Sequence, residues 1–143
     1  MKNYTPEIPL TLEQNVKVTS GDFIYDCKIC KTQENVSVTV LSTLAAGMTM
    51  TYDGDKLSFS YCDFMYDIDG KNYESKNPAI VLYEVFDYIN STEQLNAKKI
   101  DGGFKYEGKI SLGDFILIQK DDNSFSNLTM RNTDYKIEFL ENN

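Results

Sequence analysis

The sequence has 143 residues, 41% hydrophobic and 13% aromatic, which is enough to build one folded domain with its own core. Its formal net charge of −8, from 22 acidic and 14 basic residues, argues against binding nucleic acid and against binding anionic lipid through a basic patch. It contains no histidine, which excludes Ser-His-Asp and Cys-His catalysis and removes the commonest metal ligand. We therefore expect a protein that is not an enzyme and holds no metal and no cofactor.

The N-terminal residues 1–11 are expected to form a flexible arm, because Pro6 and Pro9 limit regular structure there. Residues 12–143 are expected to form a single β domain, since no linker interrupts them. Residues 1–10 contain no apolar run typical of a signal peptide, and no stretch reaches the ~20 apolar residues of a membrane span. Two origins stay open: a cytoplasmic start at Met1, or the mature part of an exported protein.

The first half of the chain alternates apolar and polar side chains, which is the period of a β-strand with one face in the core. Phe23, Tyr25, Cys27 and Ile29 are one example. We expect strands at about 12–19, 23–31, 36–40, 48–52, 57–61 and 64–68. The sequence DGDK at residues 53–56 lies between two alternating runs and predicts a tight hairpin turn.

Three cysteines, Cys27, Cys30 and Cys62, occur in this half. On a strand, positions three apart face opposite sides, so Cys27 and Cys30 are expected to be small strand residues rather than a redox pair or half of a zinc site. One disulfide that uses Cys62 stays open.

The alternation changes once, to the spacing of a helix. Asn77 is expected to cap this helix and Pro78 to occupy its first turn, with 79–89 following. On a helical wheel, polar residues form only one narrow stripe, of Asn77, Glu84, Asp87 and Ser91. A helix that is apolar over most of its circumference must be embraced by a concave surface, and a strongly curved sheet provides one.

Strands are expected again at about 94–100, 104–110, 115–120, 126–132 and 135–140, joined by Gly- and Asp-rich turns. Links this short join antiparallel neighbours. The expected fold class is therefore mainly β (α+β). We expect an antiparallel, strongly curved, half-open β-barrel of about ten strands wrapped around one central helix.

Several segments carry a resemblance: GDFIY at 21–25, the block 47–61, the helix near 78–89 and GDF at 113–115. Their order resembles the LolA/LolB-like fold, and more narrowly the small secreted lipoproteins of clostridial and related gut bacteria. The resemblance implies an incomplete barrel around a helix, with an apolar cavity that takes up acyl chains in carrier members. It also implies an extracytoplasmic protein, membrane-anchored in its full-length precursor through a lipid that this chain lacks.

The first functional hypothesis is a non-enzymatic envelope lipoprotein, monomeric, whose cavity binds an acyl chain or a lipidated protein. Aromatic and methionine side chains suit such a lining because they offer large, adaptable contact area. The candidate lining residues come from the central strands and the helix: Met48, Met50, Tyr52, Phe59, Tyr61, Phe64, Tyr66, Tyr83 and Phe86.

The second hypothesis is a structural or interaction protein of the cell envelope, with a filled core and no ligand. Its contacts would come from Asp53, Asp55 and Lys56 at a hairpin tip, or from an edge strand near 135–139. The third is an enzyme using an acidic pair, Asp67 with Asp69 or Asp121 with Asp122, or a calcium loop at 121–123. Each pair lies beside an expected turn, where aspartate caps the backbone, so we favour a structural role for them.

Overall fold

The computed structural model describes residues 11–42, 46–61, 64–69, 77–91, 97–122, 124–131 and 133–140, with the backbone alone for residues 66, 68 and 69. Residues 1–10 of the expected arm lie outside this range, as does Cys62 with the disulfide considered for it. Cys27 is buried, Cys30 is half-buried, and both are free thiols.

The described strands form one antiparallel sheet of eleven strands, in the order β6-β5-β4-β3-β2-β1-β11-β10-β9-β8-β7. Their bounds are β1 Leu12–Ser20, β2 Phe23–Lys31, β3 Val36–Val40, β4 Thr49–Tyr52, β5 Lys56–Tyr61, β6 Phe64–Asp69, β7 Lys98–Ile100, β8 Gly103–Ile110, β9 Gly113–Lys120, β10 Phe125–Met130 and β11 Tyr135–Phe139. The outermost strands β6 and β7 pair with one neighbour each, so the sheet is curved but not closed.

The sheet consists of two meanders, β1–β6 and β7–β11, which meet where the first strand pairs with the last. In this pairing Val16 lies opposite Phe139 and Ser20 opposite Tyr135. The expectation that residues 135–139 form an edge strand is therefore wrong, because β11 has a partner on each side. Hairpin-length turns explain the order within each meander, whereas the β1–β11 pairing is a long-range contact that local sequence does not specify.

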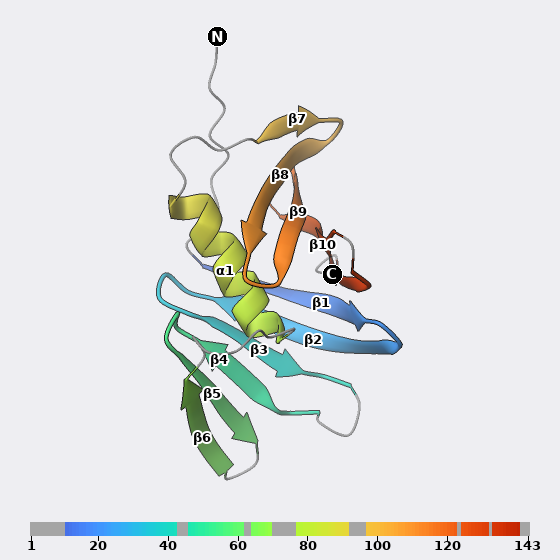
Figure 1. The fold of residues 1–143 in the computed structure, drawn as a ribbon. Coiled ribbons are helices and arrows are strands. Elements are labelled where there is room, and N and C mark those ends of the chain that lie inside the picture. The colour runs from blue at the N-terminus through green and yellow to red at the C-terminus, as the bar shows by residue number, and fades with distance from the viewer. Residues whose placement is uncertain are drawn as a thin grey trace.

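The helix α1, Pro78–Ser91, connects the two meanders and crosses the concave face of the sheet (Figure 1). Asn77 caps it as expected: its side-chain oxygen accepts a hydrogen bond from the Ala79 backbone N–H at 2.9 Å. Its main contacts are with β3 and β4 on one flank and β8 on the other, so the sheet flanks the helix rather than encircling it. Eight helix residues are buried: Pro78, Ala79, Ile80, Val81, Leu82, Val85, Phe86 and Ile89.

The expected alternation places the core on the inner face of the sheet. Val16, Ile29, Val38 and Leu117 are fully buried there, and the hydroxyls of Ser37 and Thr51 pair at 2.7 Å on the opposite face. The alternation misleads at the start of β2. Phe23 shares the face of Cys27 and Ile29, yet its side chain is 74% exposed, because the β1–β2 hairpin extends beyond the elements that cover this face.

Candidate functional site

The nine side chains expected to line an interior cavity fall into distinct groups. Met50, Tyr52 and Phe86 are buried; Met48, Phe59 and Tyr83 are partly buried and pack against the core; Tyr61 and Phe64 are 40% and 77% exposed. The side chain of Tyr66 lies outside the described part of the chain. The expectation that Tyr61 and Phe64 face an interior is wrong, because they flank the β5–β6 turn at the end of the sheet, away from the main contacts of α1.

One flank of α1 is held by the β4–β5 hairpin. The ring of Tyr83 on the helix meets the ring of Tyr52 on β4 edge to face, with 5.1 Å between centroids. The turn is closed by Asp53, whose carboxylate accepts hydrogen bonds from the backbone N–H groups of Lys56 and Asp55 at 2.8 and 2.9 Å. These bonds lower the pKa of Asp53. Asp53 was one of the residues considered for partner contacts at this hairpin tip. In the structure its role is to close the turn.

The other flank of α1 is held by the second meander. The Glu84 carboxylate accepts hydrogen bonds from the backbone N–H and the hydroxyl of Ser111, at 3.0 and 2.6 Å. One turn further along the helix, the ring of Tyr88 meets that of Phe115 edge to face at 5.5 Å. The polar stripe expected on the helix is therefore partly used in tertiary contacts.

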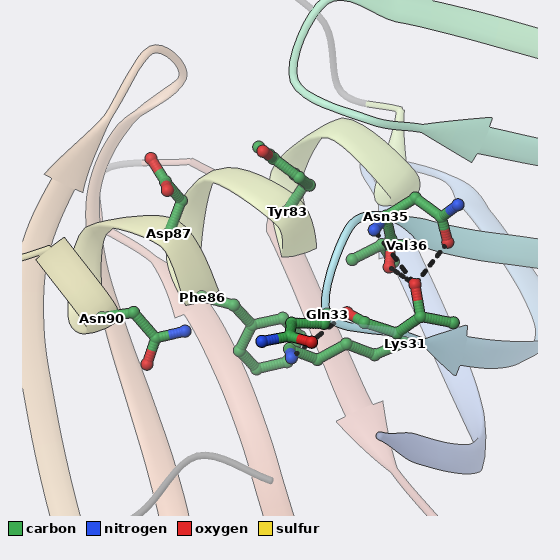
Figure 2. Close-up of a pocket in the computed structure, with 9 residues that line it drawn as sticks. Lys31, Gln33, Asn35, Val36, Tyr83, Phe86, Asp87 and Asn90 are labelled. Carbon is green, nitrogen blue, oxygen red and sulfur yellow. Dashed lines mark hydrogen bonds between the residues drawn. The ribbon is translucent and has the colours of Figure 1, made fainter. Parts of the chain in front are cut away.

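A pocket lies between α1 and the turn that joins β2 to β3 (Figure 2). Its volume is about 60 Å³. This is room for a few water molecules, whereas pockets for small organic ligands usually measure about 300–1,000 Å³. The lining residues are Lys31, Thr32, Gln33, Asn35, Val36, Tyr83, Phe86, Asp87 and Asn90. This pocket does not have the size or the apolar lining of an acyl-chain site.

Lys31 is the buried charged side chain of this pocket, and sequence reasoning overlooked it. Its ammonium lies 5.6 Å from the centroid of the Phe86 ring and donates a hydrogen bond to the Thr32 carbonyl at 3.4 Å. Burial lowers the pKa of Lys31. The position of Lys31 in the strand could have predicted its burial, because residues 27, 29 and 31 point to the same face and Cys27 and Ile29 are buried.

Other polar groups are buried on the inner face of the sheet. The Tyr106 hydroxyl donates a hydrogen bond to the Gln119 side-chain oxygen at 2.8 Å. Within the described residues, the Gln14 side-chain oxygen and the Tyr135 hydroxyl are buried with no hydrogen-bond partner. Burial raises the pKa of the Cys27 thiol to about 12, which makes it a poor nucleophile.

Of the acidic pairs considered for catalysis, Asp121 and Asp122 make surface and turn interactions. Asp121 accepts a hydrogen bond from the Lys99 ammonium at 2.8 Å. Asp122 accepts from the backbone N–H and the hydroxyl of Ser124 at 3.0 and 2.5 Å, which lowers its pKa. The side chain of Asp69 lies outside the described part. Among the described residues, no group of three or more acidic or cysteine side chains is placed to hold a metal ion.

No helix within the described ranges has the length and apolar content needed to cross a membrane.

No protein-family model matches the sequence, and no curated protein matches it. Among solved structures, an uncharacterized conserved protein from Thermus thermophilus is similar with a TM-score of 0.53 and 7% identity, covering 96% of this chain and 81% of that chain. A chain in the complex of the CwlD amidase from Clostridioides difficile with the GerS lipoprotein is similar with a TM-score of 0.55 and 13% identity, covering 94% and 86%. A LolA superfamily protein from Nitrosomonas europaea was also found, with a TM-score of 0.42 and 15% identity, covering 96% and 73%.

At these identities the likeness concerns the fold alone. The structure has the architecture that the sequence led us to expect, an open, curved antiparallel sheet with one helix across its concave face. The fold class is confirmed as mainly antiparallel β, with eleven strands instead of about ten.

Proposed function

We propose that this protein is a non-enzymatic interaction protein of the cell envelope, which binds a partner protein through its surface while its own helix fills the hollow of the sheet. The observation that carries the proposal is the packing of α1. Leu82, Val85 and Phe86 are at most 2% exposed, and the Phe86 ring packs against the tilted ring of Phe125 on β10, with 5.4 Å between centroids. A helix packed this closely occupies the place where a carrier of this shape would hold its cargo.

The similar structures support this proposal at the level of the fold. One of them contains two proteins in complex, an amidase and a lipoprotein, so the fold occurs in an assembly of this kind. The proposal includes that the protein acts outside the cytoplasm, as a monomer held at the membrane by a lipid anchor; the lipoprotein in that complex supports this part of it.

Binding of an acyl chain or a lipidated partner is the second candidate. One observation favours it: the interior holds two buried polar atoms, the Gln14 side-chain oxygen and the Tyr135 hydroxyl, without hydrogen-bond partners among the described residues. Such atoms call for an explanation, and an ordered water or the polar end of a ligand supplies one. The pocket beside Lys31 is too small to add to this case.

Titration with a fluorescent fatty acid separates the two candidates. We expect no saturable binding by the purified protein. Native mass spectrometry of protein isolated from envelope extract is expected to show a complex with one partner protein and no bound lipid. Saturable uptake of the fatty acid, or a lipid that stays bound through purification, would overturn the proposal in favour of a carrier.

A further inference from the structure

Exposed large apolar side chains gather at one end of the first meander. Seven such side chains occur in the described part of the chain, and six of them lie at this end. We call these six the apolar rim: Phe23, Ile24, Leu41, Tyr61, Phe64 and Met65. The seventh, Leu140, follows β11 at the opposite end, where its backbone N–H donates to the Asn15 carbonyl at 2.8 Å.

The antiparallel topology brings the rim together. Phe23 and Ile24 begin β2, Leu41 follows β3, and the other three flank the β5–β6 turn. The C-terminal ends of β1, β3 and β5 lie on the same side of the sheet and follow one another from the right to the bottom of Figure 1. Six strands at ~4.8 Å spacing give this end a width of about 24 Å.

The register places the rim side chains on both faces of the sheet. Phe64 lies opposite Tyr61, and the next residue, Met65, lies opposite Ser60. Phe64 and Met65 therefore point to opposite faces, and each is 77% exposed. A complementary surface must cover the end of the sheet and not one face alone.

The opposite end of the same meander is polar. The β2–β3 turn is held by the Thr32 hydroxyl, which accepts from the backbone N–H groups of Glu34 and Asn35 at 3.3 and 3.2 Å. The β4–β5 turn is held by Asp53. Within the described part of the first meander, the exposed large apolar side chains thus lie at one end, which is the pattern of an interaction surface and not of scattered surface residues.

The charge at the rim indicates the kind of partner. The sequence stretches 18–27, 40–50 and 58–66 contain three aspartates and no lysine or arginine. Of these aspartates, Asp22 and Asp26 are described and exposed. The nearest basic residues on neighbouring strands already face carboxylates: Lys17 lies opposite Asp26, and Lys136 pairs with Glu138 at 2.9 Å. The rim is therefore apolar and acidic.

We propose that the apolar rim docks a partner protein whose surface is apolar and edged with lysine or arginine. The proposal rests on the proposed function and deepens it by naming the surface and the chemistry of the partner. An acidic rim repels anionic lipid, and a second copy would bring aspartate against aspartate, so a basic protein surface is the complement.

Selection of a random peptide library on the immobilised full chain tests the proposal. We expect enrichment of peptides that combine aromatic or aliphatic residues with lysine or arginine, and binding that weakens as salt is raised. The triple variant Phe23→Ser, Phe64→Ser, Met65→Ser should bind these peptides at least about tenfold more weakly. The charge variant Asp22→Lys should also weaken binding, and the matched control Leu140→Ser, at the other end, should not. Circular dichroism of each variant checks that it folds.

The proposal is overturned if no peptides are enriched, if the enriched peptides lack basic residues, or if they bind the triple variant as tightly as the wild type. It is also overturned if the rim variants instead abolish co-sedimentation with phosphatidylcholine vesicles or a concentration-dependent dimer. These outcomes concern the rim alone. The fatty-acid titration decides the proposed function separately, because a saturable lipid site would overturn that function whatever the rim binds.

Discussion

The side chain of Tyr83 on α1 lies over Gly54, at the tip of the β4–β5 hairpin, and the two fit because Gly54 has no side chain. A Cβ atom at Gly54 would lie 2.6 Å from the Tyr83 hydroxyl oxygen. The backbone of Gly54 also has φ +96°, a conformation that other residues rarely adopt. Since Tyr83 packs on Tyr52 as well, this contact joins the helix to the hairpin.

The substitution Gly54→Ala should therefore destabilise the protein twice, through backbone strain and through displacement of Tyr83. Gly47→Ala is a matched control, because Gly47 has φ +95° and nothing within 4 Å of a Cβ placed there. We expect Gly54→Ala to lower the free energy of unfolding by about 1 kcal/mol more than Gly47→Ala, as measured by urea unfolding. Equal losses would show that Tyr83 adapts without cost.

Phe86 and Phe64 were both expected to line a cavity, and the structure separates them. Phe86→Ala should lower the free energy of unfolding by about 3–5 kcal/mol, because Phe86 is 2% exposed and packs against Phe125. Phe64→Ala removes the same atoms at an exposed position and should change the free energy of unfolding by at most about 0.5 kcal/mol. Chemical unfolding of both variants tests this contrast, and a large loss for Phe64→Ala would contradict its placement.

Stability should fall in alkaline solution. Burial raises the pKa of Cys27 from 9.0, and those of Tyr25 and Tyr106 from 10.0, in each case to about 12. The folded protein thus keeps protons that the unfolded chain releases. The stabilisation from these groups is complete below pH 9 and is lost progressively up to about pH 12, by at most about 1.4 kcal/mol per pH unit for each group.

Urea unfolding at a series of pH values from neutral upward measures this loss. In Tyr106→Phe, one titrating group is gone, so stability should fall less steeply above pH 10 than in the wild type. A free energy of unfolding that stays constant between pH 9 and 12 would contradict the burial of these groups.

The helix cap makes a smaller, separable contribution. Asn77→Ala removes the hydrogen bond to the Ala79 N–H and should cost about 1 kcal/mol. Asn77→Ser keeps a capping oxygen and should retain most of that stability. Thermal unfolding compares the two variants, and equal losses would show that Asn77 acts through its other contact, the hydrogen bond to the Met50 sulfur at 3.0 Å.

The candidate lining could be predicted only in part. The alternation along a strand correctly places the side chains of Met50 and Tyr52 in the core. It also places on the inner face the side chain of Lys31, which was not among the predicted site residues. The alternation does not show how far along a strand its inner face is covered by other elements. Phe23 and Phe64 therefore resemble core residues in sequence but are exposed in the structure. Two consecutive large apolar residues, as at Phe23–Ile24 and Phe64–Met65, mark these strand ends.

By itself, the sequence determined the local structure of this protein. The two-residue alternation specifies strands, the short Gly- and Asp-rich turns specify antiparallel neighbours, and Asn77–Pro78 specifies where the helix begins, because each depends on residues close together in the chain. Only the tertiary structure decided that β1 pairs with β11, that α1 fills the concave face, and that six exposed apolar side chains meet at one end. These features depend on which distant surfaces bury each other, and that is a property of the whole packed chain and not of any one segment.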